Sequence, residues 1–180
     1  WCFWVDDFGV KYVYENGSIH LPVGYKLFSI WGGHEGSWLL WILIAVSCGR
    51  QLVSDINKSQ LKVFDYSQMS QMIVLFGIYG VFTSNPFTRI LPIAPADGLD
   101  LNPLLQDENF LIHPPCLYMG QCAMIVPFVI ACNMAKYRDK DETMMRLIKS
   151  WTLWAWGWLT LGICLGSWWA YRELGWGGWW

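Results

Sequence analysis

Charged residues are scarce in this sequence. They make up 14% of its 180 residues, while 54% are hydrophobic and 17% are aromatic, and this composition excludes an ordinary soluble domain. No polybasic stretch is present, which argues against nucleic acid as a partner. The six cysteines form no Cys-x-x-Cys pair and no cluster with histidine, so the sequence offers neither a thiol redox motif nor a cysteine-based metal site.

Four apolar segments stand out instead. A helix that crosses the hydrocarbon core of a bilayer needs about 20 mostly apolar residues, and four segments approach that length: residues 36–49, 68–84, 115–135 and 150–171. The last two contain no charged residue. We therefore expect an all-α polytopic membrane protein with about four transmembrane helices and the lipid bilayer as its surroundings.

Basic residues are unevenly distributed between the connections. Eight of the 12 Lys and Arg residues follow the first or the third apolar segment, namely Arg50, Lys58, Lys62, Lys136, Arg138, Lys140, Arg146 and Lys149. By the positive-inside rule these two connections face the inside, and both ends of the chain face the outside.

This topology divides the chain into five parts. They are an outer N-terminal segment (1–35), the first two transmembrane helices with their inner connection (36–84), a long outer loop ending in His-Pro-Pro (85–114), the third and fourth transmembrane helices (115–171), and the first half of an outer Trp-rich motif (172–180).

The long outer loop ends at a histidine followed by two prolines. Pro114 disfavours helical backbone at His113, whereas Pro115 suits the first turn of a helix. We therefore expect His113 in extended backbone just ahead of the third transmembrane helix. An imidazole held there is a candidate metal ligand, although a lone histidine in a surface loop more often has no such role.

The last 13 residues, which we call the Trp-rich segment (168–180), contain five tryptophans and three glycines. Tryptophan presents a broad flat apolar face, and glycine allows close backbone approach, so a porphyrin is one suitable partner. Tryptophan also collects at membrane interfaces whatever the function of the protein. Composition alone leaves both interpretations open.

Five motifs, taken in order, resemble the CcmF family, the haem lyase component of the cytochrome c maturation system. They are Trp31-Gly-Gly-His-Glu-Gly-Ser-Trp-Leu-Leu-Trp41, Ser84-Asn-Pro-Phe87, Asp100-Leu-Asn-Pro-Leu-Leu-Gln-Asp107, His113-Pro-Pro-Cys-Leu-Tyr118 and the Trp-rich segment. The resemblance runs from about residue 29 to the end of the chain.

The resemblance implies that haem is received from the haem chaperone CcmE on the outer face of the membrane. The haem is then held against the Trp-rich segment and presented to apocytochrome c, where its vinyl groups are joined to two cysteine thiols. By this resemblance His113 is an axial ligand of the haem iron. Wide contact with the cofactor falls to Trp168, Trp169, Trp176, Trp179 and Trp180. No residue is assigned as a catalytic acid or base.

Two departures from the family pattern bear on partners and location. The Trp-Asp-Pro continuation of the family motif is absent, which implies that a second CcmF-type polypeptide, or an unseen continuation, completes the motif. We expect the chain to be inactive alone. Such a split favours a mitochondrial inner membrane, with the Trp-rich segment facing the intermembrane space; the alternative is a bacterial inner membrane and its periplasmic face. Arg172 replaces a usual aromatic residue and either weakens stacking or places a cation near a haem propionate.

Two other functions compete with the haem lyase interpretation. A non-catalytic membrane subunit of a respiratory complex would use the aromatic residues as an interfacial belt and would tolerate loss of His113. A haem transporter would need a polar path through the membrane, and residues 115–135 and 150–171 offer almost no polar side chains for one.

Overall fold

The computed structural model describes residues 1–59, 64–138 and 141–175. Its helices are α1 (Lys11–Asn16), α2 (Val23–Phe28), α3 (His34–Ser59), α4 (Ser67–Thr83), α5 (Glu108–Tyr137) and α6 (Glu142–Leu174), with short 3-10 turns at Ser29–Trp31 and Pro103–Leu105. Within the described residues there is no strand, only an isolated antiparallel bridge between Val10 and Arg89. The expected all-α class is confirmed in this respect.

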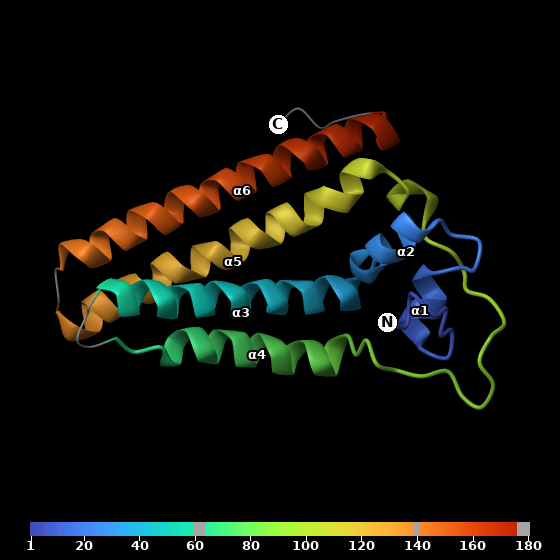
Figure 1. Cartoon of the computed structure of the whole chain (residues 1–180), viewed down its shortest axis with the longest axis horizontal. Helices are drawn as coiled ribbons and strands as arrows, with labels where there is room; N and C mark the ends of the chain where they lie inside the picture. The colour runs from blue at the N-terminus through green and yellow to red at the C-terminus, as the bar shows by residue number, and fades with distance from the viewer. Residues whose placement is uncertain (60–63, 139–140, 176–180) are drawn as a thin grey trace.

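The four long helices run alternately up and down in one bundle (Figure 1). The pair α5 and α6 has the most extensive contact, and α3 packs against both α5 and α4. Side chains with no exposed surface fill the centre of the bundle and come from three helices: Ala45 and Leu52 on α3, Val126 and Ile130 on α5, and Ala155 on α6.

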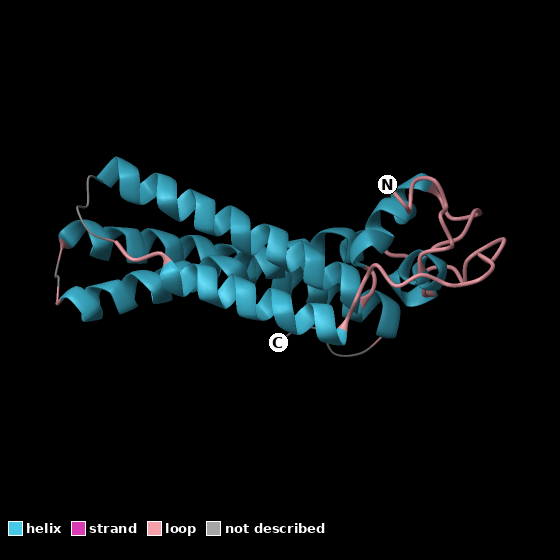
Figure 2. Cartoon of the chain, turned by 90° about the horizontal axis from the view of Figure 1, so that it is seen from below, coloured by secondary structure: helices cyan, strands magenta, loops and turns pink. Residues whose placement is uncertain are grey.

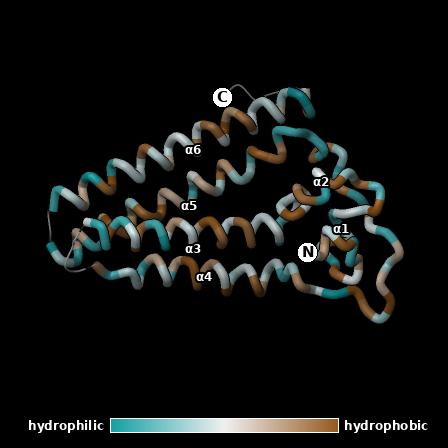
Figure 3. Tube along the Cα trace, in the orientation of Figure 1, coloured by the Kyte–Doolittle hydropathy of each residue, from teal (hydrophilic) through white to brown (hydrophobic). Residues whose placement is uncertain are grey.

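Helices α3 and α5 are each long and apolar enough to cross a membrane. Among the described helices, α4 has 17 residues and falls just short of the length required, while α6 is rich in tryptophan, which is only weakly apolar. Figure 3 shows hydrophobic residues along the middle of the bundle and hydrophilic ones towards its ends. The chain is therefore an all-α membrane protein, and its four crossings stay a prediction.

The long loops gather at one end of the bundle (Figure 2). The N-terminal segment packs there against the loop between α4 and α5, because the backbone N–H groups of Leu99 and Asp100 donate to the carbonyls of Tyr14 and Gly17. The hydroxyl of Tyr12 lies 3.2 Å from the carbonyl oxygens of Ser29 and Ile30. Burial raises the pKa of Tyr12 to about 12, so this phenol stays protonated and holds the entry to α3.

The start of α5 differs from the sequence prediction. The expectation of extended backbone at His113 is wrong, because α5 begins at Glu108 and contains His113, Pro114 and Pro115. Asp107 caps this helix, since its carboxylate accepts from the backbone N–H of Asn109 at 2.7 Å. The cap fixes the start of α5 at Glu108, earlier than expected. The bias against helical backbone that Pro114 imposes on His113 is overcome within the helix.

Candidate functional site

His113 lies between α5 and α6 at the end of the bundle that carries the long loops. Its Nδ1 is 2.7 Å from the carbonyl oxygen of Gly162. A carbonyl oxygen can only accept, so Nδ1 carries the proton and Nε2 keeps its lone pair. Histidines that bind metals are commonly oriented in this way, by donating one ring N–H to a backbone carbonyl. The contact with Gly162 thus leaves Nε2 as the candidate ligand atom of His113.

Glycines on α6 make room for this imidazole. A Cβ at Gly166 would lie 2.6 Å from Nδ1 of His113 and 2.9 Å from Nε2, closer than normal contact. One turn earlier, a Cβ at Gly162 would lie 2.9 Å from the backbone nitrogen of Leu117. The Gly-x-x-x-Gly pattern thus brings α6 against α5, as small residues do in membrane helices, and one of its glycines accommodates the ring of His113.

Trp169, one turn of α6 after Gly166, packs against residues that precede His113. Its indole N–H donates to the carbonyl oxygen of Leu104 at 3.0 Å, and its ring centroid lies 6.4 Å from that of Phe110. Trp168 is 52% exposed. Because successive helix residues point about 100° apart, Trp168 lies on another face of α6. Of the two tryptophans, Trp169 is used in packing and Trp168 is available for contact with a partner.

Arg172 forms an ion pair within the chain. Its guanidinium nitrogen lies 3.3 Å from a carboxylate oxygen of Asp107, whose side chain is 2% exposed. The same carboxylate group caps α5. Arg172 therefore joins the last turn of α6 to the first turn of α5, a structural role that the sequence did not indicate.

The remaining predicted contacts, Trp176, Trp179 and Trp180, lie outside the described residues. Within the part of the chain that the structure describes, no group of three or more His, Cys, Asp or Glu residues could hold a metal ion. A single histidine does fit an iron whose equatorial positions a porphyrin already fills. The donor set therefore suits haem and not a bare metal ion.

Sequence reasoning missed three contributors to this site: Asp107, the carbonyl of Gly162 and the space at Gly166. The Gly-x-x-x-Gly spacing in 162–166 and the Asp-Glu pair at 107–108 were the available signals. Neither signal identifies its partner, because the contacts of Gly162 with His113 and of Asp107 with Arg172 join residues 49 and 65 positions apart in the chain.

The bundle defines a class, an all-α membrane protein, and it holds an oriented histidine at its loop-bearing end. The chain belongs to the cytochrome c assembly protein family, which matches it over residues 31–180, and within that family it is of the CcmF type.

Three relatives show the extent of the similarity. The chain is 47% identical over 180 residues to the cytochrome c-type biogenesis protein CcmF of Haemophilus influenzae. It is also 47% identical over 185 residues to CcmF of Escherichia coli, and 42% identical over 181 residues to the cytochrome c-type biogenesis protein NrfE of H. influenzae. Each match covers 99% of this chain and 28% of the relative.

The chain thus spans little more than a quarter of the length of these relatives. No solved structure matches it. The relatives are all named as cytochrome c-type biogenesis proteins.

Proposed function

We propose that this chain holds haem at the outer face of an inner membrane and presents it for covalent attachment to apocytochrome c, as one part of a multi-subunit haem lyase. The observation that supports the proposal most directly is the orientation of His113. Its Nδ1–H is held by the carbonyl of Gly162 at 2.7 Å, which leaves Nε2 as the axial ligand of the haem iron.

The tryptophans divide into two roles in this proposal. Trp169 packs on Phe110 and donates a hydrogen bond to the carbonyl of Leu104, so its role is to stabilise the site through contacts within the chain. Trp168, which is exposed, and Trp176, Trp179 and Trp180 would provide flat apolar contact with the porphyrin. Arg172 is held by Asp107 and keeps the ends of α5 and α6 together beneath that surface.

Haem, when bound, supplies the vinyl groups to which the cysteine thiols of apocytochrome c add. This chain contributes position, orientation and exclusion of water. Two backbone-anchored side chains, His113 and Trp169, keep the ligand face rigid, so a reactive group can be presented in one orientation. We assign no proton transfer to a residue of this chain.

Partners and membrane follow from the family. We propose CcmE as the haem donor, apocytochrome c as the acceptor, and a second CcmF-type polypeptide or a further part of the same one as the source of the remaining ligands. The relatives named above come from bacteria, which favours a bacterial inner membrane with the site facing the periplasm. The mitochondrial inner membrane stays the alternative.

The competing functions make different demands. A respiratory subunit without haem contact has no use for an oriented imidazole, and the relatives are named for cytochrome c biogenesis. A haem transporter would need polar groups along the bundle axis, where instead Ala45, Val126 and Ala155 are fully buried.

The proposal is tested by replacing His113 in the full-length protein within its assembly. We expect His113→Ala to abolish haem staining and cytochrome c maturation while the subunits stay associated. His20→Ala is the control, because His20 is an exposed histidine of the same outer region. Unchanged haem content in His113→Ala would contradict the assignment of the axial ligand.

A further inference from the structure

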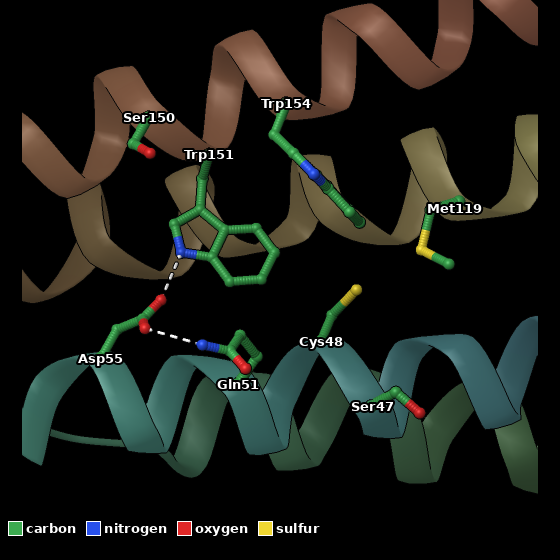
Figure 4. Close-up of a pocket in the computed structure, with 8 residues that line it drawn as sticks. All are labelled: Ser47, Cys48, Gln51, Asp55, Met119, Ser150, Trp151 and Trp154. Atoms are coloured by element: carbon green, nitrogen blue, oxygen red, sulfur yellow. Dashed lines mark hydrogen bonds between the residues drawn. The ribbon is translucent and has the colours of Figure 1, made fainter.

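A second polar site lies at the opposite end of the bundle, where the Lys and Arg count predicts the inside of the membrane. A hollow of about 470 Å³ opens between α3, α5 and α6. Figure 4 shows Asp55 at one end of it, with Trp151 and Trp154 facing it from α6. This hollow has no role in the haem site.

The carboxylate of Asp55 is held in place by neutral donors. Its two oxygens accept from the side-chain amide of Gln51 at 2.8 Å and from the indole N–H of Trp151 at 3.1 Å. Among the described residues no cation pairs with it. An oriented carboxylate beside indole rings is suited to an ammonium group, which both the negative charge and the aromatic faces attract.

The guanidinium of Arg50 lies on α3 about one turn before Asp55, nearer the middle of the helix. Arg50 lines an adjoining hollow of about 350 Å³ together with Ser47, Gln51 and Ser54, so the two hollows share Ser47 and Gln51. Arg50, too, has no ion-pair partner within the described part of the chain. A guanidinium beside hydroxyl groups is suited to a phosphate.

Apolar surface borders Arg50 on both sides along α3, from Val46 to Val53. On its other side Arg50 borders a third hollow, of about 370 Å³, which α3 and α4 line with side chains that include Val46, Val53 and Ile73. From the middle of α3 towards its end at Ser59, apolar surface that begins at Val46 is therefore joined by Arg50 and then followed by Asp55. A zwitterionic phospholipid has the same order of acyl chain, phosphate and terminal ammonium.

We propose that these hollows bind the headgroup of a zwitterionic phospholipid of the inner leaflet, with the phosphate at Arg50 and the ammonium at Asp55, on the side of the indole rings of Trp151 and Trp154. The site is independent of the haem platform. It gives the inner end of the α3–α6 contact a lipid component, since Asp55 and Trp151 come from these two helices.

The test is native mass spectrometry of the full-length protein in mild detergent, after exchange with either phosphatidylethanolamine or phosphatidylglycerol. The wild type should retain phosphatidylethanolamine in preference. Asp55→Asn should weaken that retention about tenfold, the effect of losing one charge-assisted contact, without changing haem content. Asparagine can still accept from Trp151, so the helix contact survives.

Two further variants complete the design. Glu142→Gln removes the same charge from an exposed side chain at the same end of the bundle, and it should leave lipid retention unchanged. Trp154→Leu keeps both charges and removes one aromatic face, and it should give a smaller loss than Asp55→Asn. If Asp55→Asn retains phosphatidylethanolamine as the wild type does, or if carbodiimide links Asp55 to a lysine of another segment, a lipid headgroup is not the occupant.

Discussion

His113 depends on a residue that has no side chain. Gly166 leaves space for the imidazole ring, and a Cβ there would overlap it. We expect Gly166→Ala to push the ring away from the carbonyl of Gly162, to lower the free energy of unfolding by about 1–3 kcal/mol as overpacking does, and to reduce bound haem. The measurements are haem content and thermal unfolding of the purified full-length protein.

Gly157→Ala is the matched control. It lies on the same helix, and a Cβ there would have no described atom within 4 Å. Alanine should therefore be neutral or stabilise α6 by up to about 1 kcal/mol through helix propensity. If Gly157→Ala and Gly166→Ala reduced haem equally, the loss would reflect α6 in general and not the space for His113.

The sequence indicated His113 as a ligand but misplaced its backbone. Residue patterns predict local tendencies, such as the restriction before Pro114, and a cap at Asp107 was strong enough to extend the helix through it. The partner of Nδ1 could not be predicted, because every backbone carbonyl looks the same in a sequence.

One carboxylate, that of Asp107, joins the start of α5 to the end of α6 and has two functions. Asp107 caps α5 and pairs with Arg172 of α6. We expect Asp107→Ala to lower the free energy of unfolding by about 1 kcal/mol for the lost cap alone, with a further loss from the broken ion pair. Asp107→Asn keeps the cap and should cost less, as thermal unfolding in detergent can measure.

Arg172→Gln supplies the remaining comparison. It removes the ion pair and leaves the cap intact, so it should resemble Asp107→Asn. Equal destabilisation by Asp107→Ala and Asp107→Asn would show that the cap contributes nothing to α5.

Hydrophobic runs predicted the long helices better than their ends. The segments expected at 68–84 and 150–171 lie within or close to α4 and α6. Helix α3 continues to Ser59, ten residues beyond the predicted end of its apolar run at 49, because polar residues on an exposed face do not interrupt a helix. Composition marks where lipid contact ends, whereas hydrogen bonding decides where the helix ends.

The outer region of the molecule is held partly by an ionised carboxylate. The backbone N–H of Ile19 donates to Asp97 at 2.9 Å and lowers the pKa of that carboxyl, with further donation from Gly98 and Ser18. A carboxyl whose pKa is depressed on folding contributes stability above its unfolded pKa of about 3.9, and that contribution is lost as the pH falls further. We expect residues 1–35 to loosen below about pH 4.

Limited digestion by an acid-active protease between about pH 2.5 and 5, a range that brackets the unfolded pKa of aspartate, measures this directly. Asp97→Asn should abolish the pH step and make the segment more readily cleaved at every pH tested. The carboxyls of Asp65 and Asp141, whose pKa values are also lowered by hydrogen bonds, lie at the other end of the bundle and should not affect this local cleavage. A pH step that persists in Asp97→Asn would contradict the assignment.

Ligation of the haem iron by the oriented imidazole of His113 can be tested by the visible spectrum of the full-length protein carrying His113→Gly, with and without added imidazole. We expect the glycine variant to lose the haem band of the outer site, and imidazole, entering the space left by the side chain, to restore it. A wild-type spectrum in the glycine variant without imidazole would show that His113 does not ligate the haem iron.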